Sequence, residues 1–306
     1  MSLLPPGAHG GDAHRLAHLL GRDPRDILDL SASLNPVAPD STSVLTDALD
    51  ELDRYPDDTV ATRSLAQAMG VDPERLVLTN GGAEAIALVA RRQPAGWADE
   101  MEFGLYRRHL ATLDPDGPRW RSDPHNPTGR LLDDSDRDAS VRDEAFFLLA
   151  TGEWTRGDDE TTVVGSLTKA WALPGLRIGY VLAVDEDEAT AIRRLRPRWS
   201  VNGLVCAALP ALLESAEPIR WRDGIATLRD QLVEVLRGHD IEPEPSDVNY
   251  VWVPHAPGLR ERLLTERIVL RDGASFGHPD AVRIAVPDAD GLERLARALD
   301  RVPPIT

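Results

Sequence analysis

A single lysine, Lys169, stands among 33 arginines in this chain of 306 residues. An arginine guanidinium stays protonated, whereas a lysine amine can lose its proton and condense with a carbonyl group. One lysine kept in a chain that otherwise uses arginine indicates a position that needs a primary amine. Codon usage that favours arginine, with one surface lysine left over, is the alternative explanation. The residues around Lys169 decide between the two.

Groups that suit a phosphate lie close to the lysine in the sequence. Ser166 precedes it by three residues and Arg177 follows it by eight, and a hydroxyl and a guanidinium can hold the same phosphate. The segment Asn80–Glu84 lies between an expected strand and an expected helix. Its backbone N–H groups would face outwards at the positive end of the helix, which suits a phosphate. Taken alone, this segment is explained equally well by a plain tight turn.

Two further polar residues have the right types for a ring-binding site. Asp143 ends an expected strand, where it could be an ordinary helix cap. A buried carboxylate at this point would instead keep a pyridine ring nitrogen protonated and make the ring an electron sink. Asn126 opens the turn Asn126–Gly129. Such a turn occurs in any protein, so only its spacing relative to the other candidate residues indicates a functional role for Asn126.

Short strands that alternate with helices are expected to position these residues. The expected strands are Arg75–Thr79, Ser140–Arg142, Thr161–Gly165 and Arg177–Val184, and the expected helix after the first of them is Ala83–Arg92. This alternation predicts an α/β layer with a largely parallel sheet. Ligands bind at the carboxyl ends of such strands, where Gly82, Asp143 and Ser166 all fall.

Three regions are expected along the chain. Residues 1–40 form an N-terminal arm that packs on a small domain, with a short helix at Ala13–Leu20 and a brief strand at Ile27–Leu30. Residues 41–200 form the large domain. Residues 201–306 form a smaller α+β domain, whose pattern reads as long helix, strand, helix, two short strands and helix.

Composition excludes several classes of protein. The net charge of −17 argues against nucleic acid or an anionic membrane as a partner. The chain has no apolar run of membrane-spanning length and no signal-peptide pattern at its start, so the cytoplasm is the expected compartment. The lone Cys206 excludes an internal disulfide framework, and no metal cluster is expected.

Taken together and in order, the motifs resemble the pyridoxal-phosphate (PLP) enzymes of the class I/II aminotransferase family. The motifs are His9–Gly11, Ser31–Pro36, Arg54–Asp57, Asn80–Glu84, His125–Gly129, Asp143–Phe146, Ser166–Tyr180, Trp199–Asn202 and Val282–Ala285. The resemblance implies fold type I, the aspartate-aminotransferase fold, with a mostly parallel central sheet flanked by helices and a smaller C-terminal α+β domain. Within the family, the chain resembles the threonine-phosphate decarboxylases of cobalamin biosynthesis, and next the histidinol-phosphate aminotransferases.

The resemblance also implies how the cofactor is held. Lys169 would bind PLP covalently and later shuttle the proton, Asp143 would pair with the pyridine nitrogen, and Asn126 would bond the ring hydroxyl. Phe103 would stack on the ring. The cofactor phosphate would be held by Gly82, Ala83, Ser166 and Arg177, and by Tyr55 from the partner subunit of a homodimer.

The substrate site follows from the same resemblance. Arg283 would bind the substrate carboxylate, a bidentate task that favours arginine. Arg271 and His9 would meet the substrate phosphate, and Asn35 would also contact the substrate. The implied substrate is a small phosphorylated amino acid or amine.

PLP fixes the reaction only as far as a carbanion at the substrate Cα. His9–Gly11 favours a decarboxylase that converts L-threonine O-phosphate to aminopropanol phosphate. Phe146 favours it too, because aminotransferases of this fold often carry a tyrosine there. Histidinol phosphate also carries a phosphate, so transamination is the alternative.

Three departures from the family pattern lie in the middle of the chain. Only twelve residues, Arg130–Val141, connect the Asn126 turn to the strand of Asp143. The strand expected before that turn, Arg119–Ser122, is polar, and Met101-Glu102 replaces a proline expected before Phe103. Loss of support under Asn126 and Phe103 would give a third hypothesis, a PLP-binding dimer with little turnover.

Overall fold

The computed structural model describes residues 10–133, 138–157 and 160–303. The helices are α1 (Ala13–Leu20), α2 (Thr42–Asp47), α3 (Thr59–Met69), α4 (Gly82–Arg92), α5 (Leu105–His109), α6 (Phe147–Thr151), α7 (Glu186–Leu195), α8 (Gly203–Glu214), α9 (Pro218–Arg237), α10 (Leu259–Thr265) and α11 (Ala289–Leu299). The strands are β1 (Leu28–Leu30), β2 (Leu76–Thr79), β3 (Ala95–Gly96), β4 (Thr112–Leu113), β5 (Trp120–Ser122), β6 (Val141–Asp143), β7 (Thr162–Ser166), β8 (Gly179–Leu182), β9 (Tyr250–Val253), β10 (Ile268–Asp272) and β11 (Val282–Ala285). Within these described residues, no helix is long and apolar enough to cross a membrane.

The central sheet of the large domain has the order β2-β8-β7-β6-β5. Strands β5, β6 and β7 are parallel, and β8 runs antiparallel to both of its neighbours, β2 and β7. A parallel bridge between Trp97 and Arg119 links the end of β3 to the start of β5, and β3 pairs in parallel with β4. All these strands except β8 therefore run in one direction, which confirms the mostly parallel sheet.

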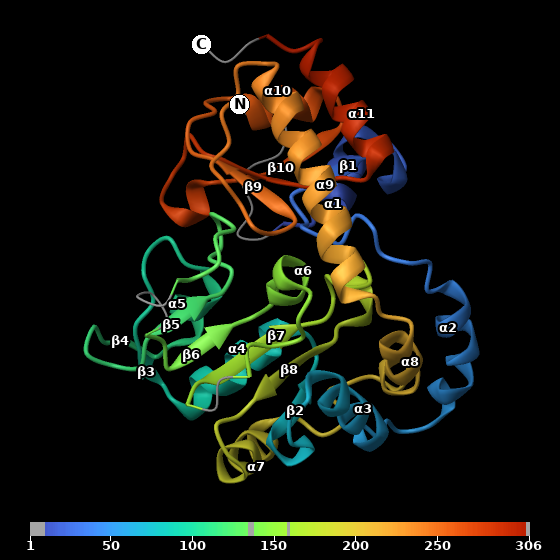
Figure 1. Cartoon of the computed structure of the whole chain (residues 1–306), viewed down its shortest axis with the longest axis vertical. Helices are drawn as coiled ribbons and strands as arrows, with labels where there is room; N and C mark the ends of the chain where they lie inside the picture. Colours follow the sequence, from blue (N-terminus) through green and yellow to red (C-terminus); the bar gives the residue numbers. More distant parts are fainter. Residues whose placement is uncertain (1–9, 134–137, 158–159, 304–306) are drawn as a thin grey trace.

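Alternate side chains of the sheet enter two different cores, as the two-residue period of a strand requires. Along β2, Leu76 and Leu78 belong to one buried cluster, which includes residues of α3, α6 and α8. Val77 belongs to the other cluster, which includes residues of α4, α5 and α7. Figure 1 shows these helices around the sheet. Helices thus cover both faces of the sheet, so a site for a ligand can form only at the ends of the strands.

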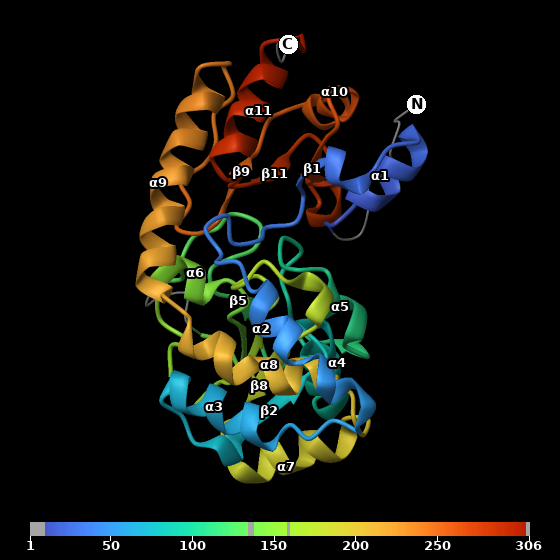
Figure 2. The same cartoon turned by 90° about the vertical axis from the view of Figure 1, so that its right-hand side faces the viewer.

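The small domain is a four-stranded sheet of order β1-β10-β11-β9, with α9, α10 and α11 packed around it. Strand β1 of the N-terminal arm pairs in parallel with β10, and Leu28 lies opposite Ile268. Leu16 of α1 shares a buried cluster with Leu264 and Val269. The arm is therefore part of this domain's sheet and core, and Figure 2 shows α1 on the side of the small domain away from α9.

The division between the domains differs from the predicted one at residue 200. Val205, Cys206 and Leu209 of α8 lie in the same buried cluster as the residues of α3. Trp221, at the start of α9, lies there too, whereas Leu232 lies in the core of the small domain. Helix α9 therefore runs from one domain into the other, as Figure 2 shows, and the division falls within it.

The connection between β5 and β6 contains no helix in the part of it that the structure describes. A buried carboxylate takes over the anchoring of this connection. Asp123 is fully buried, its Oδ1 accepts a hydrogen bond from the backbone N–H of Leu132 at 3.0 Å, and its Oδ2 pairs with Arg156. The short crossover is thus held by polar contacts where a longer one would pack apolar side chains.

Candidate active site

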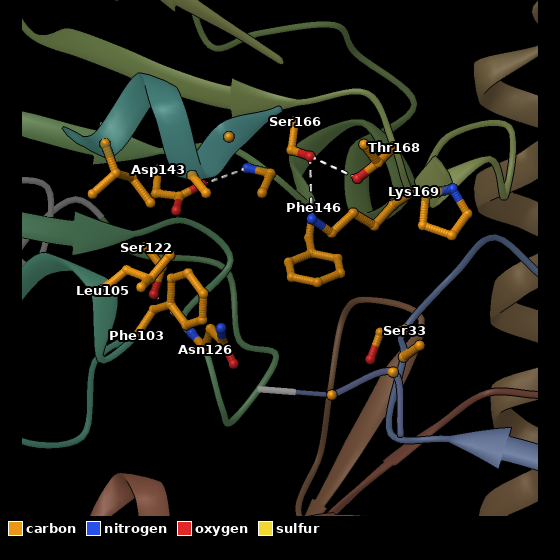
Figure 3. A pocket seen from close by; sticks show the side chains of 18 of the residues that line it. Ser33, Phe103, Leu105, Ser122, Asn126, Asp143, Phe146, Ser166, Thr168 and Lys169 are labelled. Carbon is orange, nitrogen blue, oxygen red and sulfur yellow. Dashed lines mark hydrogen bonds between the residues drawn. The ribbon is translucent and has the colours of Figure 1, made fainter. Parts of the chain in front are cut away.

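A cavity of about 720 Å³ lies at the carboxyl ends of β5, β6 and β7, between the two domains. Most of the residues proposed from the sequence line it, and Figure 3 shows several of them facing the same space. These residues are Gly82, Ala83, Phe103, Asn126, Asp143, Ser166, Lys169, Arg177, Arg271 and Arg283. Segments far apart in the sequence therefore meet at one place.

The Lys169 amine lies inside this cavity, in the turn that follows β7. Its Nζ donates a hydrogen bond to Ser166 Oγ at 3.1 Å and lies 5.4 Å from the centre of the Phe146 ring. Burial lowers the pKa of Lys169 from 10.5 to about 8; the Asp143 carboxylate opposes this shift, and the cations Arg177 and Arg283 add to it. About a tenth of the amine is therefore neutral at pH 7, and this neutral form is the one that attacks a carbonyl group.

Asp143 is the last residue of β6, and its carboxyl group lies across the cavity from the lysine (Figure 3). Its Oδ2 accepts a hydrogen bond from the Tyr106 hydroxyl at 2.8 Å, and its Oδ1 accepts one from the backbone N–H of Ala145 at 2.9 Å. Burial raises the pKa of Asp143, whereas the two hydrogen bonds and Lys169 oppose the rise. The carboxylate is held in a fixed orientation on a sheet strand, which suits a ring nitrogen as its partner.

The start of α4 and the Arg177 guanidinium form an anion-binding corner. Gly81 has a φ of +77°, and a Cβ atom added there would lie 2.4 Å from Arg177 Nη2. A Cβ atom at Gly82 already lies within 3.1 Å of Ser166 Cβ. The absence of a side chain at Gly81 leaves room for the guanidinium beside the helix N-terminus, where backbone N–H groups and the helix dipole favour an anion.

Arg283 and Asn126 meet across the domain boundary. Arg283 lies on β11 and is 7% exposed, and its Nη1 donates a hydrogen bond to Asn126 Oδ1 at 2.6 Å. The guanidinium also lies 4.5 Å from the centre of the Tyr250 ring. Burial lowers the pKa of Arg283 to about 10. A buried guanidinium that faces a cavity and has a neutral partner is suited to bind a ligand carboxylate.

A second guanidinium, that of Arg271, lines the cavity beside Arg283. The two residues are paired across β10 and β11, so their side chains leave the same face of the sheet. Arg271 is 4% exposed and its Nη2 donates to Ser275 Oγ at 2.5 Å. Gly10 and Gly11 line the cavity too, and the backbone N–H of Gly11 donates to Ser31 Oγ at 2.9 Å. The cavity thus has two cationic groups on the small domain in addition to the corner at Arg177.

Two of the proposed residues that the structure describes, Asn35 and Tyr55, do not line this cavity. Asn35 is buried, and its amide and backbone nitrogens donate to the carbonyl oxygens of Ala170 and Lys169 at 2.8 and 3.0 Å. It therefore holds the backbone of the lysine segment, and its contact with the substrate stays a prediction. Tyr55 is 78% exposed and its ring stacks on Trp199. His9 lies outside the described residues.

Sequence reasoning missed three residues that support the site. Tyr106, on α5, is fully buried and holds Asp143, but an aromatic residue in a short helix is typical of a core position. Ser122 ends β5 and lines the cavity, and Glu102 is hydrogen-bonded to it. Two sequence features could have pointed to Ser122 and Glu102: the unexpected polarity of the strand Arg119–Ser122, and the replacement of the proline expected before Phe103 by Met101-Glu102.

The turn that carries Asn126 also joins the two domains. The Tyr250 hydroxyl donates to the carbonyl oxygen of His125 at 3.3 Å. Asp247 binds the same turn twice, through its backbone N–H to the carbonyl of Gly129 at 2.8 Å and through Oδ2 to the N–H of Leu131 at 2.9 Å. The position of Asn126 therefore depends on both domains.

Known structures share this architecture. A histidinol-phosphate aminotransferase from Sinorhizobium meliloti, solved in complex with pyridoxal-5'-phosphate, superposes with a TM-score of 0.80 at 18% identity and covers 94% of this chain and 93% of its own. The L-threonine-O-3-phosphate decarboxylase from Porphyromonas gingivalis has a TM-score of 0.76 at 22% identity, over 90% and 98% of the two chains. At these identities, the likeness confirms the predicted fold.

Sequence comparison goes further. Residues 122–299 match the family model described as aminotransferase class I and II. A threonine-phosphate decarboxylase of Salmonella typhimurium is 30% identical over 96% of this chain and 96% of its own, and a histidinol-phosphate aminotransferase of Thiobacillus denitrificans is 27% identical over 98% and 91%. The chain therefore belongs to the aminotransferase class I and II family of PLP-dependent enzymes.

Proposed function

We propose that this protein decarboxylates L-threonine O-phosphate, with PLP as cofactor, and releases aminopropanol phosphate and carbon dioxide. The observation that carries the proposal is the pair of buried guanidinium groups, Arg283 and Arg271, that line the same cavity as the Lys169 amine. A substrate that carries both a carboxylate and a phosphate next to an amine matches these three groups. The relative that is 30% identical over nearly the whole chain bears the name of this activity.

The residues of the cavity fit PLP. The corner formed by Gly81, Gly82, Ser166 and Arg177 has the donors that a phosphate ester needs, and a Cβ atom at Gly81 would fill it. Asp143 offers an oriented carboxyl group for a protonated ring nitrogen. Bound PLP supplies an electron sink that stabilises negative charge at the substrate Cα.

The chain's own residues would divide the remaining tasks. Arg283, with Asn126 beside it, binds the substrate carboxylate, and Arg271 binds the phosphate. Loss of carbon dioxide breaks the bond from Cα to the carboxyl carbon, and a proton must then reach Cα. Lys169 is suited to deliver it, because its lowered pKa of about 8 lets the amine both take up and release a proton near neutral pH.

Phe146 supports decarboxylation. Its ring lies 5.4 Å from the Lys169 amine and lines the cavity, and unlike a tyrosine ring it carries no hydroxyl group. Aminotransferases of this fold often have a tyrosine hydroxyl on the cofactor oxygen at this position, as the resemblance of the sequence implied.

A homodimer in the cytoplasm remains part of the proposal. Tyr55 would reach the cofactor phosphate of the partner subunit. Its ring contacts Trp199, which is 54% exposed, and exposed apolar side chains, which favour burial against another chain, lie within six residues of it in the sequence. They are Leu49 (49% exposed), Leu52 (60%) and Val60 (63%).

Transamination of histidinol phosphate is the second candidate. Several relatives with 27% identity over at least 96% of this chain are histidinol-phosphate aminotransferases, and this substrate also carries a phosphate that Arg271 could bind. It has no carboxylate, so Arg283 would then serve the keto-acid partner of the reaction.

The test is mass spectrometry of the PLP-loaded protein incubated with L-threonine O-phosphate and no keto acid. We expect aminopropanol phosphate, with a mass lower by that of one carbon dioxide. Unchanged substrate would refute the decarboxylase, and turnover of histidinol phosphate with 2-oxoglutarate would then establish the second candidate. No turnover in either assay, with PLP still bound to Lys169, would favour a PLP-binding dimer with little turnover.

A further inference from the structure

Glu102 is a buried carboxyl group that no step above uses. It directly precedes Phe103 and is 2% exposed. Its Oε2 accepts two hydrogen bonds from Ser122, one from the backbone N–H at 3.2 Å and one from Oγ at 2.5 Å. Its Oε1 has no hydrogen-bond partner among the described residues, although Arg121 Nε and His125 Nε2 each lie 3.9 Å away. One oxygen of Glu102 is therefore bonded to Ser122 in the wall of the cavity, and the other lies near Arg121.

The hydroxyl of Ser122 connects Glu102 to a residue of the cavity, Asn126. While it donates to Glu102, Ser122 Oγ accepts the backbone N–H of Asn126 at 2.8 Å. The side chain of Asn126 in turn accepts the hydrogen bond of Arg283 at 2.6 Å. Hydrogen bonds to the backbone and to the side chain of Asn126 therefore connect Glu102, through Ser122, with the guanidinium that faces the cavity. Because Oε2 of Glu102 accepts the hydroxyl proton of Ser122, the serine rotamer is fixed and the lone pairs of Oγ are left for Asn126.

The same contact anchors the segment of Phe103. The backbone N–H of Glu102 donates to the carbonyl oxygen of Asp99 at 3.1 Å, and Phe103 accepts the N–H of Tyr106 at 3.1 Å to begin α5. Between these two turns, the side chain of Glu102 is tied to the end of β5 through Ser122. Figure 3 shows the Phe103 ring beside Ser122 and Asn126 at the cavity. Glu102 follows the position of the replaced proline, and Ser122 ends the polar strand. The two departures from the family pattern, which suggested lost support, therefore form one hydrogen-bonded contact.

We propose that Glu102 is a positioning residue, whose carboxyl group holds Ser122 so that Asn126, Arg283 and Phe103 keep their places around bound cofactor and substrate. The proposal rests on the proposed function for the identity of the substrate only. The contact itself can be tested on the protein without turnover.

The state of the Glu102 carboxyl group depends on pH. Burial raises its pKa from 4.5 to about 8; the hydrogen bonds of Ser122 and the charge of Arg121 oppose the rise, and Asp143 adds to it. The other titratable groups that face it are His125 in the following turn, Tyr106 on α5 and Tyr250 on β9. Between about pH 4.5 and 8, Glu102 holds a proton in the folded protein that it has lost in the unfolded chain. The contribution of Glu102 to the free energy of unfolding therefore falls as the pH rises through this range.

Glu144, the residue after the end of β6, provides a matched control. Its Oε2 accepts the Thr155 hydroxyl at 2.6 Å, it is 4% exposed, and burial raises its pKa to about 7. It is a buried carboxyl group with a hydroxyl partner, like Glu102, but it does not line the cavity. Variants at the two positions therefore remove similar contacts, and only one of them lies in the proposed chain of hydrogen bonds.

The experiment compares Glu102→Ala and Glu102→Gln with Glu144→Ala and Glu144→Gln. We measure the dissociation constant of PLP by titration of its visible absorbance, and the KM and kcat for L-threonine O-phosphate. Glu102→Ala is expected to weaken PLP binding and raise KM by about tenfold each, the effect of one lost hydrogen bond, with a smaller change in kcat. Glu102→Gln is expected to restore both, because its amide oxygen can accept from Ser122. Neither Glu144 variant should change KM.

A second measurement follows the urea midpoint of unfolding of the cofactor-free proteins between pH 5 and 8. The wild type should lose stability relative to Glu102→Gln as the pH rises, because the glutamine does not ionise. The proposal is overturned if Glu102→Ala binds PLP as tightly as Glu144→Ala does, or if the difference between wild type and Glu102→Gln is the same at every pH. If L-threonine O-phosphate is not a substrate at all, the proposed function fails, whereas PLP affinity and the pH series still decide the role of Glu102.

Discussion

Replacing Arg283 by methionine should separate the stability of the fold from the affinity for substrate. Arg283 is buried in the sheet of the small domain, and its Nη1 binds Asn126 across the domain boundary. Methionine fills a similar volume without charge. If the guanidinium is kept for a ligand, its loss should leave the cofactor-free protein as stable as before or more stable.

The magnitude follows from the pKa of Arg283. Burial lowers this pKa from 12.5 to about 10, and a difference of this size corresponds to about 3 kcal/mol against the charged form in the folded protein. The folded pKa lies below the unfolded one, so this penalty is fully present at neutral pH and fades only above pH 10. The variant removes it, but leaves Asn126 Oδ1 without its donor, which costs about 1–3 kcal/mol. The net change should lie between zero and a gain of about 2 kcal/mol.

The assay is urea unfolding of the cofactor-free protein at pH 7.5, with Arg142→Met as the control. Arg142 is also fully buried, but it lies 3.9 Å from the buried carboxyl group of Glu144. Removing one partner of a buried ion pair costs about 3–5 kcal/mol, so the control should be clearly destabilised. The affinity of PLP-loaded Arg283→Met for L-threonine O-phosphate should fall at least about 30-fold. A loss of stability equal to that of the control would show that Arg283 serves the fold, and would refute the reasoning.

Three other changes test separate parts of the site. The Tyr106 hydroxyl donates to Asp143 and holds the pKa of that carboxyl group down. Tyr106→Phe removes this hydrogen bond and should raise the pKa of Asp143, so the acid limb of the kcat/KM profile should move to higher pH. An unchanged profile would exclude this coupling. Lys169→Arg keeps the charge but not the amine chemistry, so borohydride reduction should add no cofactor mass and turnover should vanish, and surviving turnover would rule out the lysine mechanism. Trp199→Ala removes the ring that stacks on Tyr55, so sedimentation should show weaker dimers and activity should fall on dilution; constant activity in a monomer would contradict the cross-subunit role of Tyr55.

Much of the fold could be predicted because strand and helix periods are local properties. The strand that ends at Thr79 and the helix that ends at Arg92 both lie where their apolar patterns placed them. The strand expected from Arg177 begins only at Gly179, because Arg177 adopts a left-handed conformation with a φ of +57°. The domain division was misplaced since the apolar residues of α8 indicate burial, but not which core they enter.

The candidate site could be predicted where its residues belong to a family motif. It could not be predicted where two departures from the family pattern contact each other. Lys169, Asp143 and Asn126 come from motifs whose order along the chain is characteristic, and the structure brings them to one cavity. Glu102 and Ser122 lie twenty residues apart, and nothing in either segment indicates its partner. A pairing of this kind depends on how β5 and the start of α5 approach in space, which sequence periodicity does not encode.

The turn from His125 to Leu131 has a consequence for how ligand binding and domain motion are related. This turn is bonded to Tyr250 and Asp247 of the small domain, and its Asn126 shares a hydrogen bond with Arg283. A carboxylate that engaged Arg283 would compete with its contact to Asn126, which joins the domains, so occupancy and domain orientation would be thermodynamically linked. Such linkage is reciprocal. A crosslink that fixes the domain angle should therefore alter carboxylate affinity by the same factor by which the carboxylate favours that angle.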